Sequence, residues 1–458
     1  MRKHSQGGSF RAGIAILMAG IAIGYGLVGL AALLAFVGPG VAQDSETARI
    51  AALKAAFARP TYVPHPANNP PTPEKIALGR RIFQDPVLSA NGKVSCATCH
   101  DARLSFTDGE ALGKGVSGKA LVRHSPTLWN AAFAPLLFWD GRASSLEDQA
   151  KFPVSHPDEM GASLEAGAKL LAKDAQYREA FAKAFPTEGG SITAELMARA
   201  LAAYERTLVS PPTRFDRWAG GDNDALDASE QRGFAIFTGK GRCAVCHSGF
   251  AFTDHSFYDI GLPSDDLGRG KILDLPTTQH AFKTPTLREL AWTAPYMHDG
   301  SLATLEDVVR FYEAGGVQRP SRAGDLPKSL ELSDVERQDL IAFLETLSSE
   351  APPEPSQETW VLSSAGQPEQ PPLASVNVVH QAGKQFSPSR VAIKAGDVLT
   401  VLNDDTRTHN VRIFHPRFDY NSGAQEPRQT LSVRLPEAGT YEAFCGIHPT
   451  MRLTIEVR

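Results

Sequence analysis

Hydrophobic and polar positions along the chain follow three successive patterns. An uncharged apolar run extends from Ala12 to Gly38 and is long enough to span a bilayer. In the middle of the chain, "SITAELMARALAAYERTLV" and "LSDVERQDLIAFLETLSS" repeat apolar residues at helical spacing, and Ser333 with Glu336 forms a capping box. Near the C-terminus, "RVAIKAGDVLTVLND", "TLSVRLPEAGTYEAF" and "MRLTIEVR" alternate with a period of two, which predicts strands. The patterns predict a multidomain chain, mainly α in the middle and all-β at the end.

Proline-rich stretches separate these regions. "RPTYVPHPANNPPTPEK" leads into the helical part, and "APPEPSQETWVLSSAGQPEQPP", residues 351 to 372, is typical of a flexible linker. The remaining C-terminal segment, about 85 residues long, suits a small β-sandwich.

The N-terminus is typical of an export signal. A basic start, "MRKHSQGGSFR", precedes the apolar run, and the small residues Gly40 and Ala42 offer a cleavage site before Gln43. Because the run is longer than a usual signal core, a cleaved signal peptide and a retained membrane anchor both stay open. Either way the rest of the chain is expected in the periplasm, soluble or anchored to the cytoplasmic membrane. The net charge of −5 gives no sign of a nucleic-acid partner.

Four of the five cysteines lie in two Cys-x-x-Cys-His motifs, each followed closely by Phe-Thr-Asp. This motif is the signature of c-type haem attachment, in which two thioethers hold the porphyrin and the histidine becomes an axial iron ligand. A redox cysteine pair or half of a zinc site is the alternative, but two matching copies favour two covalent haems. The residues concerned are Cys96, Cys99 and His100, and Cys243, Cys246 and His247.

The middle of the chain repeats itself after each haem motif. "SPTLWNAAFAPLLFWDGRASSLEDQA" and "TPTLRELAWTAPYMHDGSLATLEDVV" share Pro-Thr-Leu, an Asp-Gly fourteen residues after the proline, and Leu-Glu-Asp. Self-similarity of this kind indicates a duplicated haem domain, with two related units facing each other.

The fifth cysteine belongs to a second kind of metal site. "FCGIHPTMRLTIEV" places Cys445, His448 and Met451 on one short loop, and His409 ends an earlier strand. Two imidazoles, one thiolate and a weak axial thioether form the type 1, or blue, copper set. The Cys-x-x-His-x-x-Met spacing resembles that of amicyanin-type cupredoxins; a buried free cysteine is the alternative.

These motifs assign a role to each predicted region. We expect a signal peptide or anchor at 1–42, an N-terminal c-type haem domain at 43–215, a C-terminal c-type haem domain at 216–350, a linker at 351–373 and a cupredoxin domain at 374–458.

Residues from about 70 to 350 resemble the bacterial di-haem cytochrome c peroxidases and the MauG enzymes of methylamine utilisation. The motifs that carry the resemblance are "FWDGRA", "EDQA", "HPDEM", "PTLRELAWTAPYMHDG" and "TLEDVVRFYEAGG". The resemblance implies a helical di-haem fold and chemistry on hydrogen peroxide, with the haem domain at 43–215 peroxidatic and the one at 216–350 serving electron transfer. Peroxide cleavage needs an iron with an open position and a polar group that moves a proton.

In the resembling peroxidases a histidine sixteen residues after the first motif caps the peroxidatic iron. Here that position is Val116, so the first haem is expected to be five-coordinate unless His124 substitutes. The resemblance also implies a distal glutamine and glutamate, ten and twenty residues after the motif tryptophan. These are Gln149, which would orient peroxide, and Glu159, which would shuttle its proton, while Trp139 would relay electrons between the haems.

The family's second haem takes a methionine or, in MauG, a tyrosine opposite its histidine. At the matching spacing this chain has Tyr312, with Met297 as the runner-up. The resemblance further implies calcium bound by the Thr293 and Pro295 carbonyls and by an asparagine. His124 stands at the asparagine's place and is a poor calcium ligand, while Asn130 is nearby but offset.

Three functions are expected from these observations. The first is a periplasmic peroxidase that reduces hydrogen peroxide with electrons passed through the fused copper domain, its outside donor being a small cytochrome or a quinol-linked protein. The second is a MauG-like enzyme that oxidises residues of a partner protein through high-valent iron. The third is a non-catalytic electron carrier, against which the open position at Val116 and the pair Gln149 and Glu159 argue.

Overall fold

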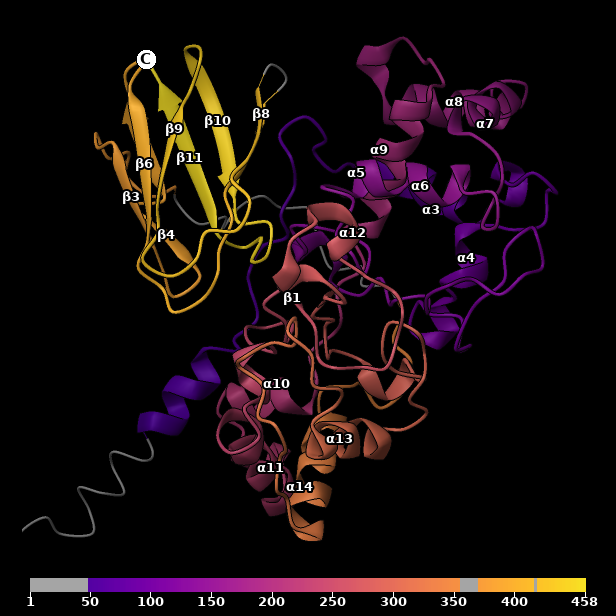
Figure 1. Ribbon diagram of the computed structural model, residues 1–458. Coiled ribbons are helices and arrows are strands. Elements are labelled where there is room, and N and C mark those ends of the chain that lie inside the picture. Colours follow the sequence, from indigo (N-terminus) through magenta and orange to yellow (C-terminus); the bar gives the residue numbers. More distant parts are fainter. Residues whose placement is uncertain (1–47, 355–369, 416–417) are drawn as a thin grey trace, which may run out of the picture. The chain divides into compact units, whose positions relative to one another are not determined.

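The computed structural model describes residues 48–354, 370–415 and 418–458 (Figure 1). By contacts the chain divides into Met1–Leu53 and a compact unit, Lys54–Arg458, which contains both haem motifs and the C-terminal strands. The predicted export segment and most of the predicted linker lie outside the described residues. Among the described helices, none is both long and apolar enough to cross a membrane.

The first part of the compact unit is helical, as the sequence pattern predicts. Its helices are α3 (Pro73–Gln84), α4 (Cys96–Cys99), α5 (Leu146–Gln149), α6 (Lys151–Ser155), α7 (Leu164–Leu171), α8 (Ala175–Ala184) and α9 (Ala194–Glu205). Helix α9 begins where the Thr193 side chain accepts a hydrogen bond from the Leu196 amide. It crosses α3 at Gly79, where a Cβ atom would lie 1.9 Å from the Ala200 carbonyl oxygen. This close crossing centres one hydrophobic core.

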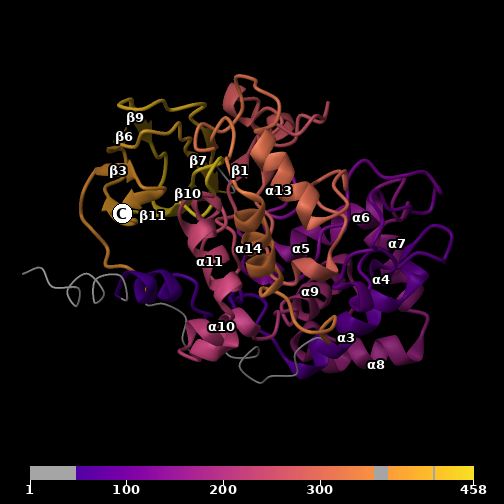
Figure 2. The same ribbon diagram turned by 90° about the horizontal axis from the view of Figure 1, so that it is seen from below.

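The second part repeats that construction. Its helices are α10 (Arg214–Ala219), α11 (Ala228–Thr238), α12 (Gly270–Leu273), α13 (Leu305–Ala314) and α14 (Asp334–Glu345), joined by a short ribbon of β1 (Phe257–Tyr258) and β2 (Phe282–Lys283). Helices α11 and α14 lie side by side in both views (Figures 1 and 2). Again a glycine allows the crossing, since a Cβ on Gly233 would lie 2.0 Å from the Asp339 carbonyl oxygen. The predicted capping box of Ser333 and Glu336 is present at the start of α14.

The C-terminal part is the predicted β-sandwich. Its strands are β3 (Val378–Ala382), β4 (Gln385–Ser387), β5 (Arg390–Ile393), β6 (Val398–Asn403), β7 (Arg412–His415), β8 (Phe418–Asn421), β9 (Thr430–Arg434), β10 (Gly439–Phe444) and β11 (Arg452–Val457). One sheet has the order β5-β11-β10-β7-β8 and the other has the order β4-β3-β6-β9. Strand β11 pairs with β5 in parallel, as β3 does with β6, and the other pairs are antiparallel. Alternate residues of β6 and β11 are buried, which places one face of each strand in the core. The predicted fold class, a helical duplicated region plus an all-β domain, is confirmed.

The core of the sandwich does not stop at its own strands. Leu273 and Leu275 of the helical region belong to the same buried cluster as Cys445, Ile447 and Met451. Phe444 in turn packs against a cluster of the helical region that contains Phe257. The two regions therefore share apolar packing around the loop that carries the copper-ligand residues.

Candidate functional site

The first haem motif forms a single helical turn that ends at its histidine. Cys96 and Cys99 bound α4, and His100 is its C-cap. A left-handed backbone at Ser105 and Phe106 turns the Phe106 carbonyl toward the imidazole, so that His100 Nδ1 donates to it over 3.0 Å. This hydrogen bond fixes the ring and leaves Nε2 as the free ligand atom, as expected for an axial histidine.

The second motif reaches the same arrangement. A 3-10 turn spans Cys243–Val245, and His247 Nδ1 donates to the Phe252 carbonyl over 2.9 Å, with Phe252 again left-handed. Burial lowers the pKa of both imidazoles, partly offset by these hydrogen bonds, so that each ring is neutral and able to coordinate a metal.

A continuous cavity of about 810 Å³ is lined by both motifs. Burial raises the pKa of the Cys96 and Cys243 thiols to about 12, so both are protonated thiols inside it. Large apolar volume, paired cysteines and one free imidazole nitrogen per motif are what two c-type haems require. The residues present therefore fit two covalent haems.

The residues predicted for the distal side of the first haem line this cavity. They are Trp139, Gln149 and Glu159, together with His124. Burial raises the pKa of Glu159, although the charges of His156 and Arg142 oppose this. A carboxyl group whose pKa lies above the usual range is suited to taking up and returning a proton near neutral pH.

Two further predicted positions lie beside Glu159 and Trp139. The Val116 amide donates to the Glu159 carbonyl over 2.8 Å, and the valine side chain offers no ligand atom. His124 is buried, its Nδ1 donates to the Glu110 carbonyl over 2.8 Å, and its own carbonyl accepts from Trp139 Nε1 over 2.9 Å. Because the Lys283 amide donates to the Trp139 carbonyl, the tryptophan is held at the junction of the two halves.

Tyr312 lies on α13 and lines the same cavity, as does Met297. Burial raises the pKa of Tyr312 above its usual range, and the nearby Cys246 and Cys243 thiols add to this rise. The tyrosine is thus close to the second attachment motif, where a ligand to that haem would stand. Thr293 and Pro295, the predicted calcium ligands, also line the cavity; calcium stays a prediction.

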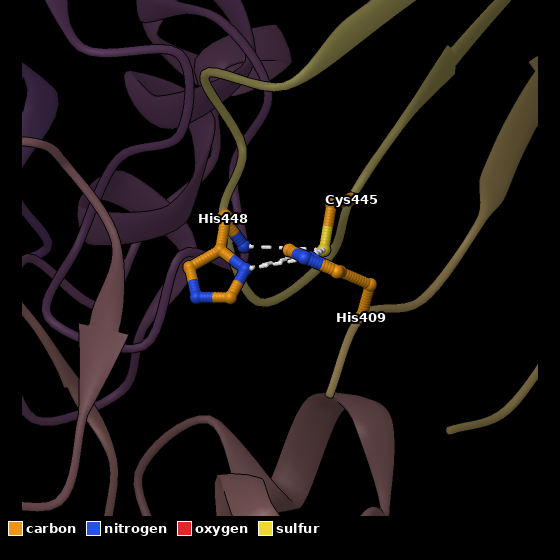
Figure 3. A group of neighbouring side chains, drawn as sticks. All are labelled: His409, Cys445 and His448. Carbon is orange, nitrogen blue, oxygen red and sulfur yellow. Dashed lines mark hydrogen bonds between the residues drawn. The ribbon is translucent and has the colours of Figure 1, made fainter. Parts of the chain in front are cut away.

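The copper-ligand residues come together at the end of the sandwich that carries the loop after β10. Figure 3 shows His409, Cys445 and His448 pointing toward one another. Cys445 Sγ lies 3.7 Å from Nδ1 of each histidine, and the two Nδ1 atoms are 3.1 Å apart. Three electron-pair donors packed this closely and buried repel one another unless a cation lies between them. The residues present therefore fit a copper ion.

Neighbouring groups hold this set in place. Met451 is buried beside it, and its carbonyl accepts a hydrogen bond from the Cys445 amide over 3.1 Å. Asp405 lies 3.1 Å from His409 Nε2, which orients that ring, and Asn410 Oδ1 accepts from the Gly446 amide. His409, Cys445 and His448 are thus brought together with a supporting layer, and Met451 as the axial ligand stays a prediction.

Sequence reasoning missed the residues that join the copper loop to the second haem half. They are Asp254 and Tyr258 on one side and Lys384 on the other, together with Arg269. The only signal in the sequence was Asp254, the last residue of the second Phe-Thr-Asp. Its partner lies 130 residues away along the chain, which no local pattern indicates.

Two haem-attachment motifs around one cavity, beside a copper-ligand set on a β-sandwich, define a redox protein with several metal centres. A family profile described as "Di-haem cytochrome c peroxidase" matches residues 73–224, and one described as "Cupredoxin-like domain" matches residues 358–457.

Known proteins match the helical region closely. The methylamine utilization protein MauG of Methylorubrum extorquens is 49% identical over 310 residues, which cover 67% of this chain and 87% of that protein. The cytochrome c551 peroxidase of Pseudomonas aeruginosa is 35% identical over 302 residues, covering 64% and 84% respectively. A solved structure described as a MauG-like protein associated with microbial copper homeostasis superposes with a TM-score of 0.60 at 32% identity, covering 68% of this chain and 96% of that one.

The chain therefore belongs to the di-haem cytochrome c peroxidase and MauG family and carries a C-terminal cupredoxin-like domain. The family resemblance stated from the sequence is confirmed. It follows that the protein is an oxidoreductase that acts on peroxide, with haem and copper as its implied cofactors.

Proposed function

We propose that this protein is a periplasmic di-haem peroxidase that reduces hydrogen peroxide with electrons delivered through its own copper domain. The observation that carries the proposal is the packing of the copper loop against the second haem half, through Leu273, Leu275 and Phe257. When bound, the first haem supplies the site where peroxide is cleaved, and the copper and the second haem supply one-electron carriers. Reduction of one peroxide to two waters consumes two electrons and two protons, so copper must be re-reduced by an outside donor.

The chain's own residues would handle the proton. Glu159, with its raised pKa, would take a proton from one oxygen of the peroxide and return it to the oxygen that leaves as water. The Gln149 amide orients the peroxide from the same wall of the cavity. At the position where a capping histidine would stand, Val116 leaves peroxide access without a prior reduction step.

Electron delivery within one chain has a physical advantage. A donor that is part of the same molecule does not have to find its acceptor by diffusion, because its effective concentration is set by the chain. In this chain, direct contacts also hold the copper loop against the second haem half. Arg269 donates to the Gly446 carbonyl over 3.0 Å and 3.1 Å, and the Phe257 amide donates to the Ile447 carbonyl over 3.2 Å.

A second function is favoured by a separate observation. Tyr312 lies by the second attachment motif, and a tyrosine ligand stabilises the oxidised state of iron where methionine would raise the potential. Together with 49% identity to a MauG protein, this favours an enzyme that oxidises residues of a partner protein. In that case the copper domain would serve to receive or supply electrons after the oxidation.

A stopped-flow experiment on the full-length, metal-loaded protein distinguishes the two. The fully reduced protein is mixed with stoichiometric peroxide while the thiolate-to-copper band and the haem bands are followed. For the peroxidase, the blue band appears as peroxide is consumed. In the Cys445→Ser variant, which loses the thiolate ligand, the second haem should instead remain oxidised after the first turnover.

Either of two results would reject the peroxidase. Copper that stays reduced while oxidised haem persists favours oxidation of a partner protein. Peroxide consumption by Cys445→Ser at the unaltered steady-state rate, with the natural outside donor present, would show that electrons bypass the copper domain.

A further inference from the structure

Tyr258, at the end of β1, lies between the copper-ligand loop and the second haem motif. The centre of its ring is 6.4 Å from the centre of the His448 imidazole, with the two planes inclined by 56°. Both side chains are buried, at 9% and 3% exposure, so no bulk water separates the two elements here. On the copper side, Tyr258 thus faces a ligand ring directly.

The hydroxyl group of Tyr258 is fixed by residues from both regions. It donates to Asp254 Oδ2 over 2.7 Å and accepts from Lys384 Nζ over 2.5 Å, and Lys384 Nζ also donates to Asp254 Oδ2 over 2.7 Å. Burial followed by the charge of Asp254 raises the pKa of Tyr258 well above its usual range, so the hydroxyl keeps its proton. The tyrosine is therefore held in one orientation by an ion pair that spans the two regions.

The same side chain lies against the second haem motif. Tyr258 lines the haem cavity together with Cys246 and His247. Asp254, which accepts the hydrogen bond of the tyrosine hydroxyl, donates its amide to the Cys246 carbonyl over 2.8 Å. Once haem is attached, the sulfur of Cys246 is a thioether bonded to the porphyrin. Tyr258 therefore faces a copper ligand with its ring and is linked at its hydroxyl end, through Asp254, to the haem-bearing Cys246.

We propose that Tyr258 is the residue that couples the copper site electronically to the second haem, with Lys384 and Asp254 as positioning residues. The inference rests on the proposed function, in which copper is the internal donor. In each transfer one electron leaves the cuprous ion, which becomes cupric, and one ferric second haem becomes ferrous. A π-system that lies beside a copper ligand and also lines the haem cavity gives a shorter gap through space than a path of saturated bonds.

Arg269 offers the competing route. It donates to the Gly446 carbonyl beside Cys445, and its Nη1 donates to the Asp140 and Gly141 carbonyls over 2.9 Å and 2.8 Å. That route contacts only the backbone of the copper loop and leads to the first haem half through saturated side-chain atoms. Tyr258 contacts a ligand ring and leads to the second half, and we therefore choose it.

The test compares Tyr258→Phe and Tyr258→Leu with the parent in the full-length, metal-loaded protein. A pulse of a photochemical reductant places one electron on copper, and its passage to the second haem is followed by the return of the cupric band and the gain of the ferrous band. Tyr258→Leu should slow this transfer by at least about tenfold, equal to about 1.4 kcal/mol in barrier. Tyr258→Phe keeps the ring but loses the hydroxyl contact, so its transfer rate should lie between those of the parent and of Tyr258→Leu.

The matched control is Tyr441→Phe. Tyr441 is a buried tyrosine of the same sandwich whose hydroxyl donates to the Glu437 carbonyl over 3.0 Å, and it contacts neither haem motif. The copper EPR spectrum and the midpoint potentials of copper and of the second haem should be unchanged in the Tyr258 variants. Hydrogen exchange at the Phe257 amide, which donates to the Ile447 carbonyl, reports whether the copper loop stays docked; if Tyr258→Leu loosens it, Tyr258→Phe alone decides.

The outcomes distinguish a failure of the proposed role of Tyr258 from a failure of the proposed function. If copper reduces the second haem in the parent and both Tyr258 variants do so at the same rate, the role of Tyr258 is overturned. The proposed function then stays intact. Slow transfer in Arg269→Met with normal transfer in Tyr258→Leu also overturns the role of Tyr258, in favour of the competing route. If the parent itself passes no electron from copper to haem, the proposed function fails, and the inference falls with it.

Discussion

The two haem halves are alike on the side of the attached histidine and different on the opposite side. In both, the imidazole Nδ1 donates to the carbonyl of a left-handed phenylalanine. Aligned through their shared Leu-Glu-Asp, Gln149 corresponds to Val308, and Pro153 corresponds to Tyr312. The second half has one continuous helix there, α13, whereas the first has two short helices, α5 and α6.

This difference teaches how one fold gives two kinds of haem site. Pro153 has no amide hydrogen to donate to the carbonyl of Gln149, four residues earlier, and α5 ends at Gln149, whereas the second half continues as one helix. At that position the first half has an aliphatic ring without a ligand atom, and the second has a phenol. On the predicted ligand set, the open first site and the closed second site would differ through a few residues on an otherwise repeated helix.

A second contrast lies in the two Phe-Thr-Asp repeats. Asp108 of the first accepts a hydrogen bond from the neighbouring Ser125 hydroxyl over 2.8 Å. Asp254 of the second forms an ion pair with Lys384 of the copper domain. One copy of the repeat therefore stabilises its own half, and the other copy has become a docking point for a further domain.

The largest effect is expected from Tyr312→Phe, which removes the difference between the two haem halves on the side opposite the attached histidine. Without the phenol oxygen the second haem loses its ligand from α13, so both haems, rather than the first alone, should bind added cyanide. The potential of the second haem should also rise, because a phenolate favours oxidised iron. Optical titration with cyanide and a spectroelectrochemical titration measure the two effects.

The control for this variant is Tyr296→Phe, in the same half, whose hydroxyl donates to the Leu290 carbonyl over 3.0 Å. It should leave the spectrum of the second haem unchanged. A Tyr312→Phe spectrum equal to that of the parent would contradict the assignment and favour Met297 as the ligand.

Glu159→Gln tests the difference between the two haem halves at the first haem. It removes the predicted proton carrier of that half and leaves the second half unchanged. Peroxide cleavage should slow by about a hundred- to ten-thousandfold, the usual contribution of general acid–base catalysis. Because burial raises the pKa of Glu159 and the ionised form accepts the proton, the parent rate should rise with pH through a pKa above the usual glutamate value. Stopped-flow rates across pH measure both.

In Glu159→Gln that rise with pH should disappear. The matched control is Glu165→Gln, an exposed carboxyl group on α7, which should keep the parent rate and pH profile. If the cleavage rate of Glu159→Gln still rises with pH as in the parent, the rise belongs to a group other than Glu159.

The smallest of the three effects concerns the two aspartates. Lys384→Met leaves Asp254 buried without its cation and should lower the free energy of unfolding by about 3 kcal/mol, the low end for a broken buried pair, since Lys384 keeps some solvent access. Burial by itself would raise the pKa of Asp254, but Lys384 holds it below the usual range. The stabilisation is therefore present above the unfolded-state pKa of about 4 and is lost as the pH falls.

Ser125→Ala, the equivalent change in the first half, removes one hydrogen bond to a carboxylate and should cost about 1.5 kcal/mol. Urea denaturation followed at the copper and haem bands measures both variants. Equal losses in the two would refute the view that the second repeat docks the copper domain while the first does not.

The sequence predicted much of the fold and most of the candidate site because these depend on short spacings. Two cysteines and a histidine within five residues can reach one porphyrin only if they share a turn, and Cys445, His448 and Met451 share one loop in the same way. Helical and strand periods predicted the duplicated α region and the sandwich, and the family resemblance placed Gln149, Glu159 and Tyr312 on the cavity wall.

What only the tertiary structure decided is how the copper domain meets the haems. The sequence suggested a tether, but Leu273 and Leu275 lie in the core of the sandwich, and Lys384 pairs with an aspartate 130 residues away. Contacts between side chains so distant in sequence depend on how two finished surfaces pack, and hydrophobic periodicity within either segment carries no information about that packing. The position of Tyr258, beside His448 and on the wall of the haem cavity, is of this kind.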